Sequence, residues 1–418
     1  MKLDVLGLIG ACSYALDCVE AELVHVTNKH AKRVAYMSVC TAMQMGITDR
    51  KLQDLAVCAL LHDNALTQYI QEEFHNDISH VDSIKELPHA GAHCVMGEQN
   101  IKDIPFYTDV KNVILYHHEN ADGSGPFGKK WNEIPLFARI IHMCDLLDMV
   151  CLRKAVDFET WKKISEFLSK IRGTVIDDEC ADAFMDAGVS VMNMEDSQIE
   201  KSLWEKVPRE KIELTFEQIK NIAGFFARIV DYKSPFTSTH SIGVAECARK
   251  LSGYMGFDDE TVQKMYLAGA LHDIGKVAIG NDILEKPDRL TDEEYALMKS
   301  HVEKGAQILK NFTLINHVEE GALYHHERYD GSGYMYGLKG EEIPLNARII
   351  GIADAFDAMT ANRVYRKKLD KDYVIREIKR GSGTQFDPKL VEIMLGLIEK
   401  GLIDMDNLYK DGENHGEQ

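Results

Sequence analysis

The feature that most constrains the fold is an internal repeat, because the chain carries the same motifs twice. The octapeptide ALLHDNAL at residues 59–66 resembles GALHDIGK at residues 269–276. A Tyr-His-His-Glu run begins at Tyr116 and again at Tyr324. The repeated motifs lie 208 to 210 residues apart. A nearly constant offset between several motifs indicates a tandem duplication, and the fold must therefore be built from two related units.

The duplication divides the chain into four segments. The first copy is predicted to span residues 1–192 and the second residues 213–405. A polar stretch at 193–212, which contains Pro208, predicts a partly helical linker, and residues 406–418 form a polar tail. A chain of 418 residues is long enough for each copy to fold around its own core.

The apolar residues of each copy recur with the period of an α-helix. In the first copy one helical face holds Leu52, Leu55, Ala56, Ala59 and Leu60. The matching face of the second copy holds Val262, Met265, Tyr266, Gly269 and Ala270. Only 9 of the 418 residues are proline, and no run alternates cleanly enough to predict a strand. We therefore predict an all-α fold made of two tandem helical bundles.

Histidine is the residue type whose positions point to chemistry. Of 17 histidines, ten occupy positions shared by the two copies, and two aspartates in each copy are matched as well. The candidate metal ligands of the second copy are His240, His272, Asp273, His301, His325, His326 and Asp354. Their counterparts in the first copy are His30, His62, Asp63, His93, His117, His118 and Asp145. A single histidine usually has a structural role, but a repeated set of imidazoles and carboxylates is typical of a metal centre.

The number and type of these ligands limit what the centre can be. Imidazole and carboxylate ligands suit iron, manganese, zinc, cobalt or nickel. Seven ligands are too many for one tetrahedral site, and they suit two ions about 3.5–4 Å apart. Asp273 is the predicted bridge, because neighbouring side chains such as His272 and Asp273 point about 100° apart on a helix. Two such ions would polarise a phosphoryl oxygen and lower the pKa of bound water.

The motifs of the second copy resemble the HD-GYP subfamily of the HD metal-dependent phosphohydrolase superfamily. The resemblance rests on HDIGK from His272, HHERYDGSGY from His325 and ARIIGIADAFDAMTANRVYR from Ala347. It is strong over residues 215–405 and weaker over residues 1–192. The resemblance implies an HD-type helical bundle in each copy and a centre of two or three iron or manganese ions. It also implies hydrolysis of cyclic di-GMP or 3′3′-cyclic GMP-AMP to a linear dinucleotide, and further to mononucleotide.

The resemblance also implies a place for each ligand. One ion would be bound by His240, His272 and Asp354, the other by His301, His325 and His326, with Asp273 as the bridge. Members of the subfamily with three ions place Glu four residues before the first histidine. That position is Phe236 in this chain, which cannot bind a metal, so two divalent ions, iron or manganese, are expected.

Residues for catalysis and substrate binding follow from the same resemblance. Lys276 is expected to place its ammonium group against the scissile phosphate, where negative charge develops, beside the catalytic Asp273. Tyr334 is expected to contact the nucleotide, and Asp357 to orient a metal ligand or an arginine.

Two prolines of the subfamily are replaced in this chain. Its Gly-Tyr-Pro motif ends in Met335 here, and its Arg-Pro-Tyr-Arg motif has Val364 in second place. Arg363 and Arg366, which the resemblance implies hold phosphates, remain. Because proline fixes φ, we expect these changes to affect loop order, rate and the choice of dinucleotide, and to leave the metal ligands intact.

The first copy keeps all seven ligands and loses most of the other residues. Leu66 stands where the second copy has Lys276, Ala65 replaces the preceding glycine, and Pro126 aligns with the tyrosine of the second copy. Lys154 at the position of Arg363 is a partial match. We therefore expect the first copy to be regulatory or architectural, and to contact a signalling partner or a second copy of the chain.

Composition excludes several other classes of function. With 48 Lys and Arg against 67 Asp and Glu, the net charge of −19 disfavours binding to long nucleic acids or to anionic membranes. No apolar run reaches the roughly 18 residues of a membrane-spanning helix. Nine cysteines without a paired spacing suit a reducing compartment, and a cytoplasmic location is therefore expected.

Two alternative functions fit parts of the same pattern. One is a cyclic-dinucleotide receptor or scaffold with little turnover, which the acidic composition and the divergent first copy favour. The other is a different HD phosphohydrolase, acting on mononucleotides or (p)ppGpp. Tyr334 and the Asp-Gly-Ser-Gly loop before it disfavour the second alternative, because simpler HD enzymes lack that run.

Overall fold

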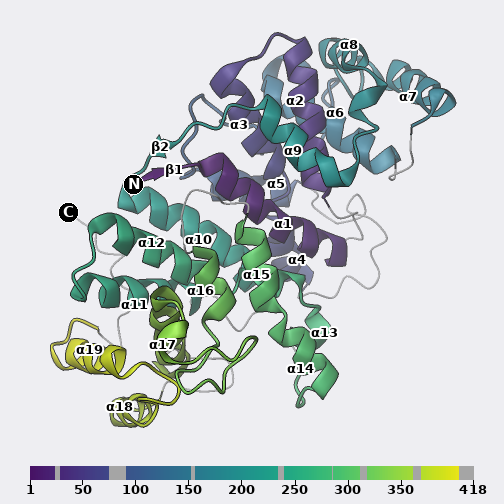
Figure 1. The fold of residues 1–418 in the computed structure, drawn as a ribbon. Helices are drawn as coiled ribbons and strands as arrows, with labels where there is room; N and C mark the ends of the chain where they lie inside the picture. The colour runs from purple at the N-terminus through teal and green to yellow at the C-terminus, as the bar shows by residue number, and fades with distance from the viewer. Residues whose placement is uncertain are drawn as a thin grey trace. The chain divides into compact units, whose positions relative to one another are not determined.

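The described parts of the chain are mainly helical, so the prediction of an all-α fold is confirmed (Figure 1). The computed structural model describes residues 1–23, 29–74, 91–151, 156–233, 240–284, 286–310, 318–360 and 369–403. Within them, the strands are β1 (Lys2–Leu3) and β2 (Ile212–Glu213), which form one two-stranded sheet.

No described helix is both long enough and apolar enough to span a membrane.

The chain divides into two compact units. The first unit is Asp4–Ile212; the second begins at Glu213 and also contains Met1–Leu3. The amino group of Met1 donates a hydrogen bond to the carbonyl of Leu214 at 3.1 Å, which ties the N-terminus to the second unit.

The first unit contains nine α-helices in its described residues. They are α1 (Val5–Leu23), α2 (His30–Gln44), α3 (Asp49–Leu60), α4 (Leu66–Phe74), α5 (Ala92–Ile101), α6 (Leu136–Cys151), α7 (Phe158–Ile171), α8 (Asp178–Ala187) and α9 (Asp196–Lys206). Two short 3₁₀ helices, η2 (Trp131–Glu133) and η3 (Val189–Val191), lie between them.

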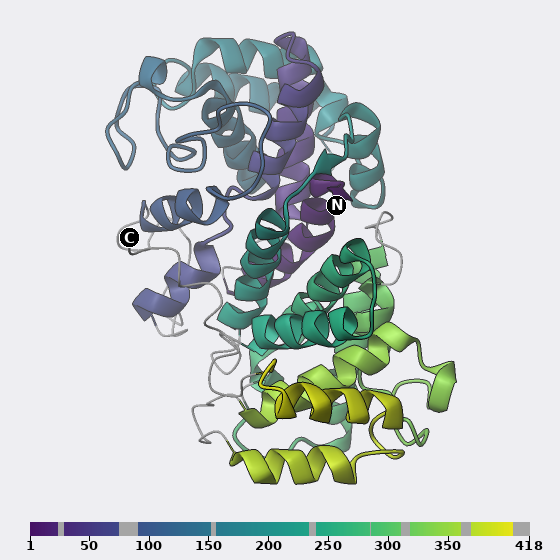
Figure 2. The same cartoon turned by 90° about the vertical axis from the view of Figure 1, so that its left-hand side faces the viewer.

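The second unit repeats this order with additional short helices. Its described elements are α10 (Phe216–Lys233), α11 (His240–Tyr254), α12 (Asp259–Ala270), η4 (Ile274–Ala278), α13 (Asn281–Leu284), α14 (Asp292–Lys299), α15 (His301–Lys310), α16 (Val318–Tyr324), η5 (Gly340–Glu342), α17 (Leu345–Thr360), α18 (Lys371–Arg380) and α19 (Pro388–Glu399). Helices α18 and α19, yellow in Figure 2, contact each other and α17.

Each unit is built on the same three central helices. In the first unit α2 packs against α3 and α6, and in the second α11 packs against α12 and α17. The apolar face predicted for the first copy lies on α3 and is buried throughout. On α12 the matching face is buried except at Val262, which is half-buried. These helices fix the positions of His30 and His62 in the first unit and of His240 and His272 in the second, because these histidines lie at or next to the helix ends.

The segment 193–212, predicted as a partly helical linker, belongs to the first unit. It contains α9, which packs on α2 of the first unit. Ile199 and Leu203 are buried, and Lys32 pairs with Glu200 at 3.0 Å. The apolar positions four residues apart indicate this packing, although the polar composition of the segment hides it.

Candidate metal centre

The structure brings the seven predicted ligands of the second unit together. His240 begins α11, His272 and Asp273 follow α12, His301 begins α15, His325 and His326 follow α16, and Asp354 lies on α17. The ligand atoms of His240, His272 and Asp273 lie within 4.8 Å of one another, and so do those of Asp273, His301, His325 and His326. Asp273 is common to both groups.

The two carboxylate oxygens of Asp273 face different imidazoles. Its Oδ2 lies 3.1 Å from Nε2 of His272, whereas its Oδ1 lies 3.3 Å from Nε2 of His301 and 3.8 Å from Nε2 of His325. Nε2 of His240 lies 3.2 Å from Oδ1 of Asp354. The carboxylate of Asp273 therefore lies between two separate sets of ligand atoms.

The other ring nitrogen of four of the five histidines is held by the protein. His272, His301 and His325 each donate from Nδ1 to the backbone carbonyl three residues earlier, at 2.7, 2.7 and 3.0 Å. Nδ1 of His240 instead donates to Oδ2 of Asp357 at 2.7 Å. These hydrogen bonds fix the rings so that Nε2 points into the cluster, as in metal sites whose ligands are oriented by outer contacts.

Several of the converging atoms lack a hydrogen-bond partner. They are Nε2 of His272, His301 and His325, and Oδ1 of Asp273, all of which are buried. Buried polar atoms are usually hydrogen-bonded, because an unsatisfied one costs about 1–3 kcal/mol. A set of unpartnered nitrogen and oxygen atoms that face one another fits a bound cation.

Burial and neighbouring charges set the protonation of the cluster. Burial lowers the pKa of His301 to about 4 and holds the pKa of His325 well below its usual value. Burial alone would raise the pKa of Asp273, but the charges of His272 and Lys276 hold it well below the usual range. Neutral imidazoles at His301 and His325 beside an ionised Asp273 are the protonation states that bind metals.

The pKa of His240 shifts in the opposite direction to the pKa values of His301 and His325. Burial alone would lower the pKa of this imidazole, but hydrogen bonds to Asp354 and Asp357 raise it to about 10. His240 thus contacts two carboxylates, those of Asp354 and Asp357, one from each ring nitrogen.

Lys276 and Tyr334, the predicted catalytic and substrate residues, both lie at the cluster. Nζ of Lys276 lies 2.5 Å from Oδ2 of Asp273. The ring of Tyr334 stacks on that of His326, with centroids 4.9 Å apart and an interplanar angle of 29°.

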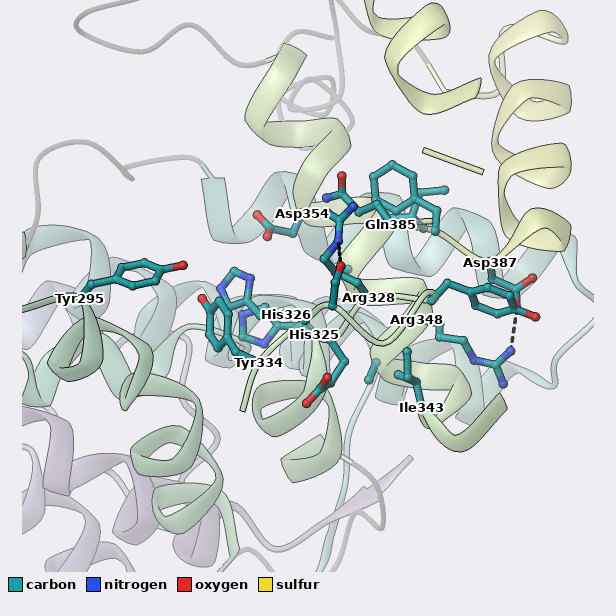
Figure 3. Close-up of a pocket in the computed structure, with 18 residues that line it drawn as sticks. Tyr295, His325, His326, Arg328, Tyr334, Ile343, Arg348, Asp354, Gln385 and Asp387 are labelled. Atoms are coloured by element: carbon teal, nitrogen blue, oxygen red, sulfur yellow. Dashed lines mark hydrogen bonds and ion pairs between the residues drawn. The ribbon is translucent and has the colours of Figure 1, made fainter. Parts of the chain in front are cut away.

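A cavity of about 280 Å³ opens beside His326 (Figure 3). Two polar residues that line it, Arg328 and Gln385, were not among the predicted site residues. The sequence does mark these two positions as different between the copies, because the first copy has Asn120 and Val175 there. The cavity wall is therefore polar in the second unit at positions where the two copies differ.

Arg348 also lines this cavity, but its contacts are structural. It pairs with Asp387 at 2.6 Å, as the dashed line in Figure 3 shows, and the matching pair Arg139 and Asp177 lies 3.2 Å apart in the first unit. Asp387 and Asp177 also cap α19 and α8 through their side chains. The pair therefore holds the following helix in both units.

A buried glutamate holds the loop that follows the paired histidines. Glu327 accepts hydrogen bonds from the amides of Tyr336, Gly337 and Leu338 at 2.7, 3.2 and 3.1 Å. Glu119 has the same role in the first unit. Sequence analysis assigned no role to this glutamate, although it belongs to the repeated motif.

The first unit brings its seven matched residues together in the same way. Asp63 Oδ1 lies 3.4 Å from Nε2 of His93 and 3.3 Å from Nε2 of His117, and His30 lies 3.2 Å from Asp145. The remaining two, His62 and His118, contact the same carboxylates at 3.4 and 3.9 Å. His62 and His117 also donate from Nδ1 to the carbonyl three residues earlier.

Three replacements change the chemistry of the first unit. Leu66 is buried where the second unit has Lys276. His142 replaces Gly351, and its ring lies 6.4 Å from that of His118. Cys94 replaces Val302 beside the first-unit cluster. Burial alone would raise the pKa of Cys94, but the imidazoles of His117 and His93 lower it to about 7.

Some predicted residues lie outside the described residues. They are Arg363, Arg366 and Val364 of the phosphate-binding motif, Phe236 at the third-metal position, Lys154 of the first copy and the tail 406–418.

The model of the family described as HD domain matches residues 17–160 and 225–390. The chain belongs to the HD domain family. The resemblance found in the motifs is thus confirmed, and the two matched segments fall one in each half of the chain. HD-domain phosphohydrolases depend on metal, and both units of this member contain groups of residues that could hold an ion.

Relatives within the family act on cyclic dinucleotides. The 3′3′-cGAMP-specific phosphodiesterase 1 of Vibrio cholerae is 28% identical over 86% of this chain and 84% of its own length. The cyclic di-GMP phosphodiesterase of Thermotoga maritima is 39% identical over 43% of this chain, which covers 50% of that relative.

A solved structure has the same fold. The crystal structure of the cyclic GMP-AMP specific phosphodiesterase V-cGAP3 of V. cholerae aligns with a TM-score of 0.65 and 22% identity. The alignment covers 97% of this chain and 100% of the other. The solved structure therefore shares its fold with this chain along nearly the whole length of both.

Proposed function

We propose that the second unit is a metal-dependent phosphodiesterase that hydrolyses a cyclic dinucleotide, cyclic di-GMP or 3′3′-cyclic GMP-AMP, to the linear dinucleotide. The observation that carries the proposal is the position of Asp273, whose two oxygens face separate imidazole groups in a cluster whose His325, His326 and Asp354 line a cavity. Two ions that share a carboxylate are a common arrangement in phosphoryl-transfer enzymes.

The proposed ligands divide around Asp273. His240, His272 and Asp354 would hold one divalent ion, and His301, His325 and His326 the other, with Asp273 as the bridge. Iron or manganese suits this set of nitrogen and oxygen donors. When bound, such ions polarise a phosphoryl oxygen and lower the pKa of water. The unpartnered Nε2 atoms and Oδ1 of Asp273 support this assignment.

The number of ions is tested by anomalous scattering from crystals at a metal absorption edge. Two peaks in the second unit are expected. Three peaks within about 4 Å of one another would contradict the dinuclear assignment.

The side chains of the second unit have complementary roles toward the substrate. Lys276 neutralises charge that develops on the phosphate oxygens, and its contact with Asp273 holds the ammonium group at the cluster. The half-buried stack of Tyr334 on His326, which lines the cavity, offers an aromatic surface to a nucleobase. Arg328, on the cavity wall, supplies a planar donor for a phosphate or for a base edge.

The relatives support the class of substrate. The relative that aligns along most of this chain is specific for 3′3′-cGAMP, whereas the cyclic di-GMP phosphodiesterase of T. maritima aligns with less than half of it. Both dinucleotides are therefore the substrates to compare.

We further propose that the first unit is regulatory or architectural. It lacks the lysine and the tyrosine of the second unit, and His142 stands where the cavity of the second unit has Gly351. An imidazole at that position takes space next to His118 that a substrate would need.

The proposal is tested by assaying anaerobically purified protein with both cyclic dinucleotides, with metal content and products analysed together. His272→Ala/Asp273→Ala is expected to abolish hydrolysis. The matched variant His62→Ala/Asp63→Ala is expected to keep at least about a tenth of the rate, a loss within roughly 1.4 kcal/mol.

Other outcomes would identify the alternatives. Tight binding of a cyclic dinucleotide without turnover by the metal-loaded protein would indicate a receptor. Faster hydrolysis of mononucleotides or (p)ppGpp would indicate a different HD phosphohydrolase. Equal loss in both variants, with unchanged circular dichroism, would show that the first unit is itself catalytic.

A further inference from the structure

The first unit has a potential ligand that the second unit lacks. Cys94 is the third residue of α5, directly after His93, and the second unit has Val302 at that position. The thiol is completely buried, and its Sγ lies 3.5 Å from Nε2 of His93. The ligand atoms of His93, Cys94, His117 and His118 all lie within 4.8 Å of one another.

A second observation points to a ligand at this group. Nε2 of His117 and Oδ1 of Asp63 are buried and have no hydrogen-bond partner, although they lie 3.3 Å apart. Nε2 of His62 is also buried and unpartnered. A buried cysteine alone would be explained as a small apolar side chain. Unsatisfied nitrogen and oxygen atoms facing the same point are not explained in that way, and they fit a cation.

A thiolate changes which cation the site prefers. Cysteine is a soft ligand that selects zinc and other thiophilic metals, whereas sets of imidazole and carboxylate suit a wider range that includes iron and manganese. The described ligand groups of the second unit contain no cysteine. The two units thus offer different donor sets at matching positions.

We propose that Cys94 ligates a divalent metal ion together with His93, His117 and His118, and that this site of the first unit selects Zn²⁺. The site would hold a structural ion next to α5 and the turn at His117. It would not depend on the hydrolytic activity proposed for the second unit.

The experiment is zinc K-edge X-ray absorption on the full chain loaded with Zn²⁺, compared with Cys94→Val, which introduces the residue of the second unit. A sulfur shell at about 2.3 Å is expected for the wild-type chain, and nitrogen and oxygen scattering alone for the variant. Cys180→Val, which removes a buried cysteine of α8, is the matched control and should keep the sulfur shell.

Zinc binding by His272→Ala/Asp273→Ala isolates the first unit. This variant should retain one Zn²⁺ per chain, and adding Cys94→Val should weaken its zinc affinity at least about tenfold while manganese affinity changes little. Folding of Cys94→Val is checked by circular dichroism. If this variant does not fold, Cys94→Ser is used in its place. Zinc bound without sulfur scattering, or no zinc retained by the first unit, would overturn the proposal.

Discussion

At the scale of single residues, Lys276 is the side chain that most clearly separates the two units. Its ammonium group lies on the carboxylate that both ligand groups share, and a buried leucine occupies the matching position of the first unit. We expect Lys276→Ala to lower kcat by about 10²–10³-fold, the effect of removing one donor that stabilises transition-state charge. Metal content should stay near normal, because the lysine is not a ligand.

The effect of Lys276→Ala is to be compared with that of Asp273→Ala. It should lose metal and activity together, since it removes the carboxylate shared by both groups of ligands. Steady-state kinetics and metal analysis of the two variants distinguish these cases, and an unchanged rate in Lys276→Ala would refute the role assigned to the lysine.

Also at the residue scale, the repeat shows why some site residues can be found from sequence and others cannot. The seven residues of each cluster recur at matched positions, so the comparison of copies is sufficient to select them. Arg328, Gln385 and Cys94 differ between the copies, and a comparison that searches for matches passes over them. Their importance depends on which side chains share a cavity or cluster, which is a property of the fold.

At the scale of elements, the short helix η4 depends on close packing against α15. An added Cβ at Gly275 would lie 1.9 Å from the carbonyl oxygen of His301 and 2.5 Å from the amide of Gly305. Gly275→Ala must therefore push η4 away from α15, at a cost of about 1–3 kcal/mol in the free energy of unfolding. Because η4 carries Lys276, turnover should fall as well.

The matched control for Gly275→Ala is Ala65→Gly in the first unit. It should lower stability by only about 0.5–1 kcal/mol, through backbone entropy, and leave turnover unchanged. Urea unfolding and kinetics measure both effects; wild-type turnover in Gly275→Ala would show that the contact of η4 with α15 is not needed for catalysis.

The loop after the paired histidines gives a second prediction at this scale. Glu327→Gln removes the charge that accepts three backbone hydrogen bonds and should destabilise the second unit by about 2 kcal/mol. The loop carries Tyr334, so KM should rise more than kcat falls. Glu119→Gln should cost similar stability with normal kinetics, and equal kinetic effects in the two variants would contradict this assignment.

The helical class and the apolar faces of α3 and α12 were predicted from the helical periodicity. The packing of α9 was not predicted, since only Ile199 and Leu203 of this polar helix are buried and its packing partner α2 is more than 150 residues earlier. A distant partner of this kind is not contained in the local pattern.

At the scale of the whole molecule, two units with separate cores and separate clusters should unfold in two steps that metal affects independently. An ion present at about 100 times its Kd stabilises the unit that binds it by about 2.7 kcal/mol. Differential scanning calorimetry should show both transitions moving down in temperature after chelation. In His272→Ala/Asp273→Ala only one transition should still respond, whereas transitions insensitive to chelation would indicate that neither cluster binds metal.

The hydrogen bonds from Nδ1 of the cluster histidines to backbone carbonyls have a consequence for how such a duplicated chain evolves. The acceptors at Ala59, Ile114, Gly269, Met298 and Ala322 are main-chain atoms, present whatever side chain the codon specifies. No point mutation deletes such an acceptor while the helix end keeps its shape. A copy released from selection for catalysis can therefore lose its lysine and tyrosine early and still keep its imidazoles aimed inward, ready to acquire a different ion.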